Sequence, residues 1–311
     1  MRIYYRLSDK SYPKTKLIGS SKEICLKNFC QAFAEVIFGK DPPPPEDFIP
    51  PVRIICDNCE RRTVKMIAET GIPYTLTELG NAGSLKHALE LAIKEAEDDE
   101  LVYFCEDDYL HLPNACILLQ EGIKRSEYVT LYDHPDKYTR VYNGGEFSKV
   151  IRTHSSHWRY TASTCMTFGT KAKTLKADLE TWHKYTSETH PHDHRIFTDL
   201  LKNGRRLAVC IPGAACHVDL TFSSAIGEML IEPWAIEMMI QELEQQIEQS
   251  VREWCEQQGV PELPPSFRGF LIATQSKQGK EKLLALEALR YHLTKKGEPD
   301  SGSPYDSPTT A

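Results

Sequence analysis

Residues 97–109 read EDDELVYFCEDDY, so the same acidic triplet stands on both sides of one apolar run. The run Leu101–Cys105 is short, apolar and partly aromatic, which is typical of a strand that is buried on both faces. A strand rises about 3.3 Å per residue, so we expect the two triplets roughly 20 Å apart, at opposite ends of the strand. The stretch therefore predicts a buried strand of a sheet with acidic residues at each end.

The two triplets are expected to differ in role. In open α/β sheets, ligands bind outside the carboxyl ends of the strands, where Glu106–Asp108 stand. Three adjacent carboxylates repel one another unless a cation or strong donors neutralise them. We therefore predict a hard-cation site at Glu106–Asp108, with a solvated acidic loop as the alternative. Glu97–Asp99 is interpreted as a solvated turn between a helix and the strand.

Residues 1 to about 215 alternate between strand-like and helix-like segments, which predicts an α/β layered domain. The expected strands are Ile3–Leu7, Val52–Cys56, Tyr74–Leu79, Leu101–Cys105, Glu127–Tyr132, Thr161–Phe168 and Arg206–Ile211. The expected helices are Lys22–Phe38, Arg61–Glu69, a segment from Gly80 to Ile93 with Ser84 as its cap, Pro113–Lys124, Lys171–Tyr185 and His194–Asn203. Six prolines predict an irregular loop over Asp41–Pro51, and residues 133–158 are expected to form a long loop or hairpin.

Composition indicates a soluble globular protein of 311 residues, 41% apolar and 26% charged. The net charge of −7 argues against nucleic-acid phosphate as the main partner. No run of about 18 apolar residues occurs, so no transmembrane segment is predicted. The first residues, MRIYYRLSDK, lack a signal-peptide pattern. Most of the ten cysteines lie in apolar surroundings, which suits reduced thiols and a cytoplasmic location.

Cys56 and Cys59 form a CxxC pair, with no second CxxC that would complete a zinc site. We interpret them as one core cysteine at the end of a strand and one cysteine on the following turn. Zinc binding and redox chemistry are the less favoured alternatives.

The sequence pattern changes after the alternating region, from alternating strands and helices to helices alone. From Pro233 a long helix is expected, with apolar residues spaced near 3.6 and Glu and Gln on its other face. A second helix is expected over Lys280–Lys295, after a proline-rich break. The domains are thus predicted as 1–225 for the α/β domain, 226–296 for a C-terminal helical extension and 297–311 for a disordered tail.

Three further segments are candidates for the same site. Asn81 and Gly83 stand at a helix start, where backbone amides can meet an anion, although such a motif is often only a turn. Asp193 lies among histidines just before a helix; it is either a capping residue or an ionised general base. His217 follows the last strand and is either a structural histidine or a ligand that returns to the edge of the sheet where Asp108 stands.

In their order and spacing, these segments resemble the glycosyltransferases of the GT-A fold, especially the inverting family 2. That family has a first strand, an N-x-G motif opening a helix, a hydrophobic strand ending in D-x-D, a later E-D before a helix, and a distal His. The corresponding places in this chain are Arg2–Leu7, Asn81–Gly83, Glu106–Asp108, His192-Asp193 and His217. The resemblance covers about residues 1–220.

The resemblance implies a GT-A mixed sheet flanked by helices, and a metal-dependent transfer of a sugar from a nucleotide-sugar donor. Asp108 would be the direct ligand of Mn²⁺ or Mg²⁺, which would bridge the diphosphate of the donor, and His217 would be the distal ligand. Asp107 and Glu106 would contact the ribose or the groups that bind the metal. A UDP-sugar is the expected donor.

The remaining roles concern the donor base and the acceptor. The resemblance implies that Asp193 deprotonates the acceptor hydroxyl, so that attack inverts the anomeric carbon. Asp57 at a strand end, with Arg6 as a further candidate, would contact the nucleobase. Asn81 at the helix start would lie close to the donor.

The chain departs from the family pattern in three places. The acidic motif is Glu-Asp-Asp instead of D-x-D, and the base motif is His-Asp instead of Glu-Asp. The family's membrane-associated R-W motif is absent, so we expect one transfer per acceptor and not processive synthesis. Two alternatives remain. A sugar-1-phosphate nucleotidyltransferase would need a Gly-rich basic loop where Ser8–Pro13 stands, and a non-catalytic interaction module would use the C-terminal helix.

Overall fold

The computed structural model describes residues 1–10, 15–17, 19–39, 50–138, 148–219, 224 and 233–261, with further residues scattered between 269 and 290. The chain divides into two compact units, Met1–Leu230 and Ile231–Ala311. The expected tail 297–311 and most of the expected loop Asp41–Pro51 lie outside the described residues.

The first unit is built on a nine-stranded sheet among the described residues, in the order β3-β2-β1-β4-β9-β6-β10-β8-β7. Strands β3, β2, β1 and β4 are parallel, and β6 and β10 are parallel to each other. Strand β9 is antiparallel to both of its neighbours, β4 and β6, so the carboxyl ends of β1, β2, β4, β6 and β10 share one edge of the sheet. The strands are β1 Arg2–Ser8, β2 Val52–Asp57, β3 Tyr74–Thr77, β4 Leu101–Glu106, β6 Tyr128–Thr130, β7 Val150–Arg152, β8 His157–Thr161, β9 Phe168–Lys171 and β10 Leu207–Ile211.

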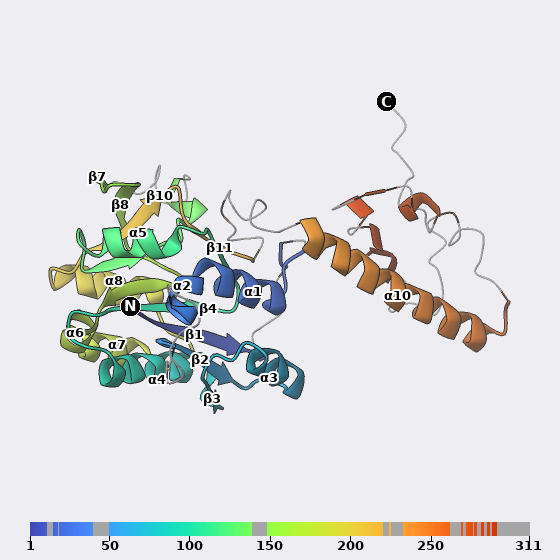
Figure 1. Cartoon of the computed structure of the whole chain (residues 1–311), viewed down its shortest axis with the longest axis horizontal. Coiled ribbons are helices and arrows are strands. Elements are labelled where there is room, and N and C mark those ends of the chain that lie inside the picture. The colour runs from blue at the N-terminus through green and yellow to red at the C-terminus, as the bar shows by residue number, and fades with distance from the viewer. Residues whose placement is uncertain are drawn as a thin grey trace, which may run out of the picture. The chain divides into compact units, whose positions relative to one another are not determined.

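Helices cover both faces of this sheet, as Figure 1 shows. The apolar cores on the two faces explain why: α1, α3 and α5 contribute to one, and α4, α6, α7 and α8 to the other. The prediction of a mixed α/β sheet flanked by helices is therefore confirmed. The helices are α1 Lys22–Ala32, α2 Ala34–Phe38, α3 Arg61–Ala68, α4 Gly80–Glu95, α5 Ala115–Gly122, α6 Ala172–Ala177, α7 Leu179–Tyr185 and α8 Asp193–Lys202, with a 3₁₀ turn η1 at Pro135–Tyr138.

Strand β4 is buried on both faces, as its sequence predicts. Tyr103 and Cys105 belong to one core, and Val102 and Phe104 belong to the other. The ring of Phe104 stacks on Phe168, whose other neighbours in the second core include Trp182. Each such side chain contributes about 1.5–3 kcal/mol when fully buried, so β4 is held by apolar contacts on both sides.

Two local predictions are wrong. No strand spans Thr161–Phe168: β8 ends at Thr161, β9 begins at Phe168, and Cys165 and Met166 between them have φ angles of 47° and 62°. This left-handed backbone interrupts a strand, although the composition favours one. Ser84 is not a cap either, since α4 begins at Gly80 and Ser84 lies buried within it.

A second, two-stranded sheet was not expected from the sequence. Strand β5, Tyr109–His111, pairs antiparallel with β11, Ala215–His217, in the register Tyr109 to His217. Because Tyr109 follows Asp108 directly, this pairing brings His217 to the end of β4. The expected loop 133–158 contains η1, β7 and part of β8, and its residues 139–147 lie outside the described part.

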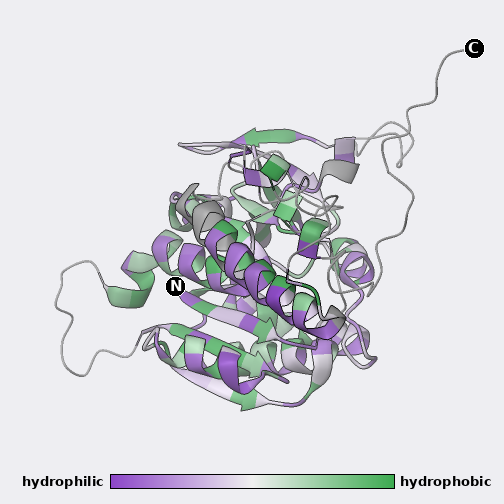
Figure 2. Cartoon of the chain, turned by 90° about the vertical axis from the view of Figure 1, so that its right-hand side faces the viewer, coloured by the Kyte–Doolittle hydropathy of each residue, from purple (hydrophilic) through white to green (hydrophobic). Residues whose placement is uncertain are grey.

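The second unit contains the expected long helix, α10, over Pro233–Gln258. Leu243 and Ile247 of α10 are buried, and so are Leu286 and Leu289. Within this unit Lys282 pairs with Glu244 at 2.7 Å. Of the expected helix Lys280–Lys295, residues 281–282, 285–286 and 288–290 are helical, and residues 291–295 lie outside the described part. Figure 2 shows hydrophilic and hydrophobic residues interleaved along the helices of the chain. Among the described residues, no helix combines the length and the apolar character that crossing a membrane requires.

Candidate active site

A pocket with a cavity volume of about 170 Å³ opens at the carboxyl edge of the large sheet. Its lining comes from the ends of β1, β2 and β4, from the start of α4 and from the loop that carries His190. This is the edge where ligands of open α/β sheets bind. Two predicted site residues, Asp193 and His217, are not part of its lining. The other six predicted site residues line it: Arg6, Asp57, Asn81, Glu106, Asp107 and Asp108.

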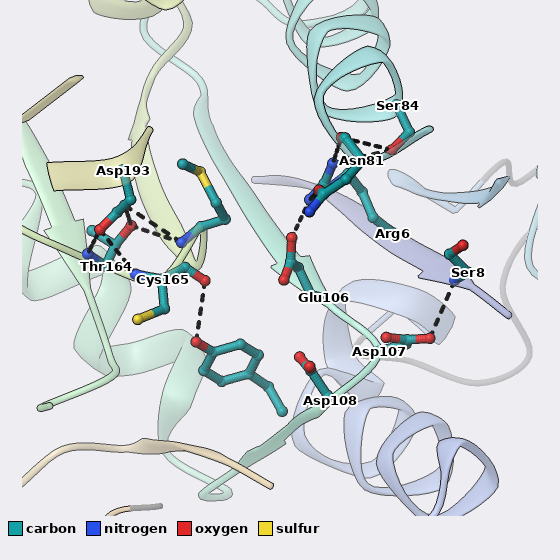
Figure 3. A network of polar contacts seen from close by, with 12 residues as sticks. Arg6, Ser8, Asn81, Ser84, Glu106, Asp107, Asp108, Thr164, Cys165 and Asp193 are labelled. Atoms are coloured by element: carbon teal, nitrogen blue, oxygen red, sulfur yellow. Dashed lines mark hydrogen bonds and ion pairs between the residues drawn. The ribbon is translucent and has the colours of Figure 1, made fainter. Parts of the chain in front are cut away.

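Each carboxylate of the second acidic triplet faces a different nitrogen group. Glu106 pairs with the guanidinium of Arg6. Lys22 Nζ lies 2.8 Å from Asp107 Oδ2, and His217 Nε2 lies 3.2 Å from Asp108 Oδ2. Figure 3 shows the three acidic side chains pointing in separate directions from the end of β4. The repulsion expected between neighbouring carboxylates is therefore relieved by groups from separate segments.

The first triplet behaves as a solvated turn. Asp98 and Asp99 have side chains 69% and 72% exposed, and both pair with lysines on the surface. Their interactions are those of exposed ion pairs, which contribute little to stability. The asymmetry that the sequence predicts between the two triplets is thus present in the structure.

Arg6 connects three elements around the pocket. Its Nη1 donates to the Asn81 carbonyl at 2.7 Å and to Ser84 Oγ at 3.1 Å. Its Nη2 donates to Asn81 Oδ1 at 3.2 Å and bonds Glu106. The guanidinium, only 6% exposed, thus fixes the start of α4 against β1 and β4. Asn81 is held by Arg6, and the neighbouring Ala82 amide donates to the Thr189 carbonyl at 3.3 Å.

Burial is the largest influence on the pKa values of Glu106 and Asp107. It raises the pKa of Glu106 and of Asp107, and the nearby Arg6 and Lys22 oppose that rise. Burial lowers the pKa of Lys22, but Asp107 and Asp9 outweigh it and hold that pKa above its ordinary value. The charges at this end of β4 therefore depend on one another for their stabilisation.

Lys22 is a site residue that sequence reasoning missed. Its ammonium group also contacts the Ser8 carbonyl and lies 3.3 Å from Asp9 Oδ1. Lys22 opens α1, directly after the capping Ser21, and a lysine at a helix start has no pattern that marks it as functional. The pocket lining adds Lys10, whose Nζ donates to Asn58 Oδ1 at 3.0 Å.

Asp57 supplies a buried carboxylate to another part of the same pocket. Its Oδ1 accepts hydrogen bonds from Thr77 Oγ1 at 2.9 Å and from the Leu79 amide at 2.6 Å. Its Oδ2 accepts one from Asn58 Nδ2 at 2.9 Å. With 2% exposure, Asp57 is fixed in orientation by the strand next to it and by the turn that follows β2.

Asp193 is bound to a loop and does not face the pocket. Its carboxylate accepts from the Thr164 amide and hydroxyl, both at 2.7 Å, from the Cys165 amide at 3.2 Å and from the Met166 amide at 3.5 Å. Burial raises the pKa of Asp193, although these hydrogen bonds oppose the rise. The Cys165 carbonyl in turn accepts from Tyr109 Oη at 3.2 Å, so the loop reaches the residue after Asp108 (Figure 3).

His217 is oriented for its contact with Asp108. The Asp219 amide donates to His217 Nδ1 at 3.0 Å, which places the ring proton on Nε2, the atom that faces Asp108. The edge of the Tyr109 ring packs against the imidazole with centroids 4.9 Å apart. Metal-binding histidines instead donate their second ring N–H to an acceptor, so a metal would bind Nε2 of His217 only after the ring proton moved to Nδ1 and the Asp219 amide released that nitrogen.

The Asp108 carboxylate fits Mn²⁺ or Mg²⁺ as an oxygen ligand, and His217 would join it only with its ring proton on Nδ1. These ligands suffice where a nucleotide's phosphates and water complete the coordination, as is usual for Mg²⁺. Among the described residues there is no group of three or more His, Cys, Asp or Glu side chains arranged to hold a metal by themselves. A metal at this place would therefore depend on its substrate for ligands.

No family model and no curated protein matches the chain. Among solved structures it is similar to 4-diphosphocytidyl-2C-methyl-D-erythritol synthase from Anaerococcus prevotii, with 11% identity, 75% of this chain and 94% of that chain covered, and a TM-score of 0.40. It is similar to S. aureus TarS 1–349, with 14% identity, 69% and 59% covered, and a TM-score of 0.40. A third is the galactosyltransferase LgtC in complex with donor and acceptor sugar analogues, with 10% identity, 68% and 72% covered, and a TM-score of 0.36.

The similar structures thus include a galactosyltransferase and a nucleotidyl transferase. At these identities and TM-scores, the likeness carries no conclusion about the activity of this chain.

Proposed function

We propose that this chain is a metal-dependent glycosyltransferase that takes a sugar from a nucleotide-sugar donor, with a UDP-sugar as the first candidate. The observation that carries the proposal is the Asp108–His217 pair, at 3.2 Å, beside the pocket that Asp108 lines. Asp57 places a second fixed carboxylate in the same pocket. A metal-binding carboxylate oriented by a histidine, together with a separate hydrogen-bonding carboxylate, suits a ligand that has a diphosphate at one end and a base at the other.

Asp108 would hold Mn²⁺ or Mg²⁺, and His217 would add Nε2 as a ligand once its ring proton moved to Nδ1. When bound, the metal supplies neutralisation of the charge that builds on the departing nucleoside diphosphate. Glu106 and Asp107 would stay paired with Arg6 and Lys22, so that Asp108 is the carboxylate left to the metal. Asp57 would accept from an N–H of the base.

Asp193 is proposed as the base for the acceptor hydroxyl. Its raised pKa, caused by burial, brings the carboxyl closer to the range in which a general base works. The acceptor hydroxyl would replace the Thr164 hydroxyl as a donor to Oδ1, the oxygen whose other donor, the Met166 amide, is as far as 3.5 Å away. The proton would pass to Oδ1 as the acceptor attacks.

A thermal-shift panel tests the proposal. The full chain is mixed with UDP, GDP, CDP and their sugar conjugates, each with Mn²⁺, with Mg²⁺ or with a chelator. We expect a rise of several degrees that requires both a metal and one nucleotide. Release of the nucleoside diphosphate from the sugar conjugate then identifies the donor.

Two outcomes would overturn the proposal. A shift with CTP, together with pyrophosphate release when a sugar phosphate is added, would indicate a nucleotidyltransferase. No shift with any nucleotide, at concentrations well above ordinary binding constants, would favour the non-catalytic interaction module.

A further inference from the structure

The turn at the end of β2 carries two thiols next to the pocket. Cys56 is the penultimate residue of β2 and is 1% exposed, whereas Cys59 is partly exposed on the turn after it. Neither is in a disulfide. Cys59 Sγ lies 3.4 Å from the Leu7 carbonyl and 3.8 Å from the Asp57 carbonyl, so it points back toward the sheet.

The two cysteines lie on the same face of the sheet: Cys56 belongs to the first apolar core, and Cys59 packs against that core. The neighbouring Cys59 thiol lowers the pKa of Cys56, although burial opposes the effect. The Cys56 thiol and burial both raise the pKa of Cys59. A CxxC pair of this kind is the arrangement in which thiol–disulfide exchange proceeds within one turn.

The residues between the cysteines belong to the pocket. Asp57 and Asn58 both line it, and Asn58 has a φ of 54°, in the left-handed region. The Asn58 side chain donates to Asp57 and accepts from Lys10, which also lines the pocket. A covalent bond across the turn would therefore act on three pocket residues at once.

We propose that Cys56 and Cys59 form a reversible disulfide that remodels the Asp57–Asn58 turn of the pocket. The oxidant is a low-molecular-weight disulfide of the glutathione class. One protein thiolate attacks a sulfur of that disulfide and releases one small thiol. The second protein thiol then attacks the mixed disulfide and releases the other small thiol. Two electrons and two protons pass from the protein to the small disulfide, and excess small thiol reverses both steps.

Redox equilibration of the full chain, followed by tryptic digestion and mass spectrometry, tests the bond itself. Trypsin releases residues 54–61 (IICDNCER) as one peptide that carries both cysteines and no other. Over a series of ratios of oxidised to reduced glutathione, we expect this peptide to become lighter by two hydrogen atoms and to resist alkylation. Dithiothreitol should restore it.

A matched variant separates this site from the other thiols. Cys59→Ser should abolish the lighter peptide, whereas Cys30→Ser, at another partly exposed cysteine, should leave it unchanged. The melting temperatures of both variants check that they fold. Alkylation of both Cys56 and Cys59 at every ratio, or glutathione attached to Cys59 without closure to Cys56, would overturn the proposal.

Hydrogen–deuterium exchange tests the remodelling without any assumption about function. We expect exchange in residues 57–60 and 6–10 to differ between oxidised and reduced wild type, and to be the same in both conditions for Cys59→Ser. A disulfide that leaves exchange unchanged in these segments would contradict the remodelling. The nucleotide-dependent thermal shift depends on the proposed function and is measured in parallel. Its absence in both redox states would count against that function and not against the disulfide.

Discussion

His217 Nε2 lies 3.2 Å from Asp108 Oδ2, although Asp108 stands in the turn between β4 and β5 and His217 ends β11. The pairing of β5 with β11 creates this relationship, because it aligns His217 with Tyr109, the residue next to Asp108. The Asp219 amide fixes the imidazole so that Nε2 faces the carboxylate. A backbone register thus sets the geometry of the candidate metal pair.

Asp108→Asn tests the metal role. We expect the metal- and nucleotide-dependent thermal shift to disappear and turnover to fall by at least about 100-fold, because a metal contributes several kcal/mol of charge stabilisation. Asp98→Asn, at the exposed first triplet, is the matched control and should keep both. Unchanged turnover in Asp108→Asn would contradict the assignment.

Asp193→Asn tests the base role. An amide can still accept hydrogen bonds from the Thr164–Met166 loop through its oxygen, but it does not take a proton from the acceptor. We expect sugar transfer to be lost while the nucleotide-dependent thermal shift is kept. If the variant loses nucleotide binding as well, Asp193 acts by holding the loop and not as a base alone.

Lys22→Met tests whether the Lys22 ammonium group stabilises the Asp107 carboxylate in the folded protein. Removal of the cation leaves a largely buried carboxylate without it, so we expect a loss of about 1–3 kcal/mol in the free energy of unfolding. A double-mutant cycle with Asp107→Asn should give a coupling of about 1 kcal/mol or more. The exposed Lys176–Asp98 pair provides the control cycle, with about 0–1 kcal/mol expected. Equal coupling in the two cycles would refute a special role for Lys22.

His111 should make stability depend on pH. Burial lowers its pKa to about 3, whereas an unfolded chain has a His pKa of about 6.5. Because the folded protein disfavours the protonated form, this contribution is complete above about pH 6.5 and is lost as the pH falls toward 3. Between pH 7 and pH 5 the loss should be about 2 kcal/mol.

Urea unfolding of wild type and His111→Phe at both pH values measures this contribution. Phenylalanine suits a site beside the rings of Phe33 and Tyr103, and the hydrogen bond from the residue 111 amide to Asn28 does not involve the side chain. The variant should lose less stability than wild type over the same pH interval. Parallel losses would show that His111 is not the group responsible.

Gly122→Ala tests the packing of α5 on the sheet. A Cβ at Gly122 would lie 2.5 Å from Trp158 Cη2, and Trp158 is fully buried. We expect a destabilisation of about 1–3 kcal/mol, as is typical of overpacked cores. Thermal or urea unfolding measures it, and combination with Trp158→Phe should cost less than the sum of the single changes because the smaller ring relieves the clash. Strict additivity would argue against the clash.

Local pattern accounts for most of the predicted elements. The apolar run before Glu106 predicts β4, since a strand that packs on both faces needs apolar residues at every position. The helix from Arg61 and the glycine after it, Gly71 with a φ of 71°, were also predicted from local signals. The prediction of a strand over Thr161–Phe168 was wrong because hydrogen bonds that the loop donates to Asp193 stabilise a different backbone there, and Asp193 is distant in sequence.

The sequence by itself determined that acidic residues stand at the carboxyl end of a buried strand, and it offered Asp57 and Asn81 as candidates for the same site. Only the tertiary structure decided which partner each carboxylate has: Arg6 for Glu106, Lys22 for Asp107 and His217 for Asp108. The physical reason is the separation in sequence between the residues that interact. Burial and periodicity act on neighbouring residues and leave a pattern in the chain, whereas an ion pair between remote segments depends on strand order and register, which no local pattern encodes.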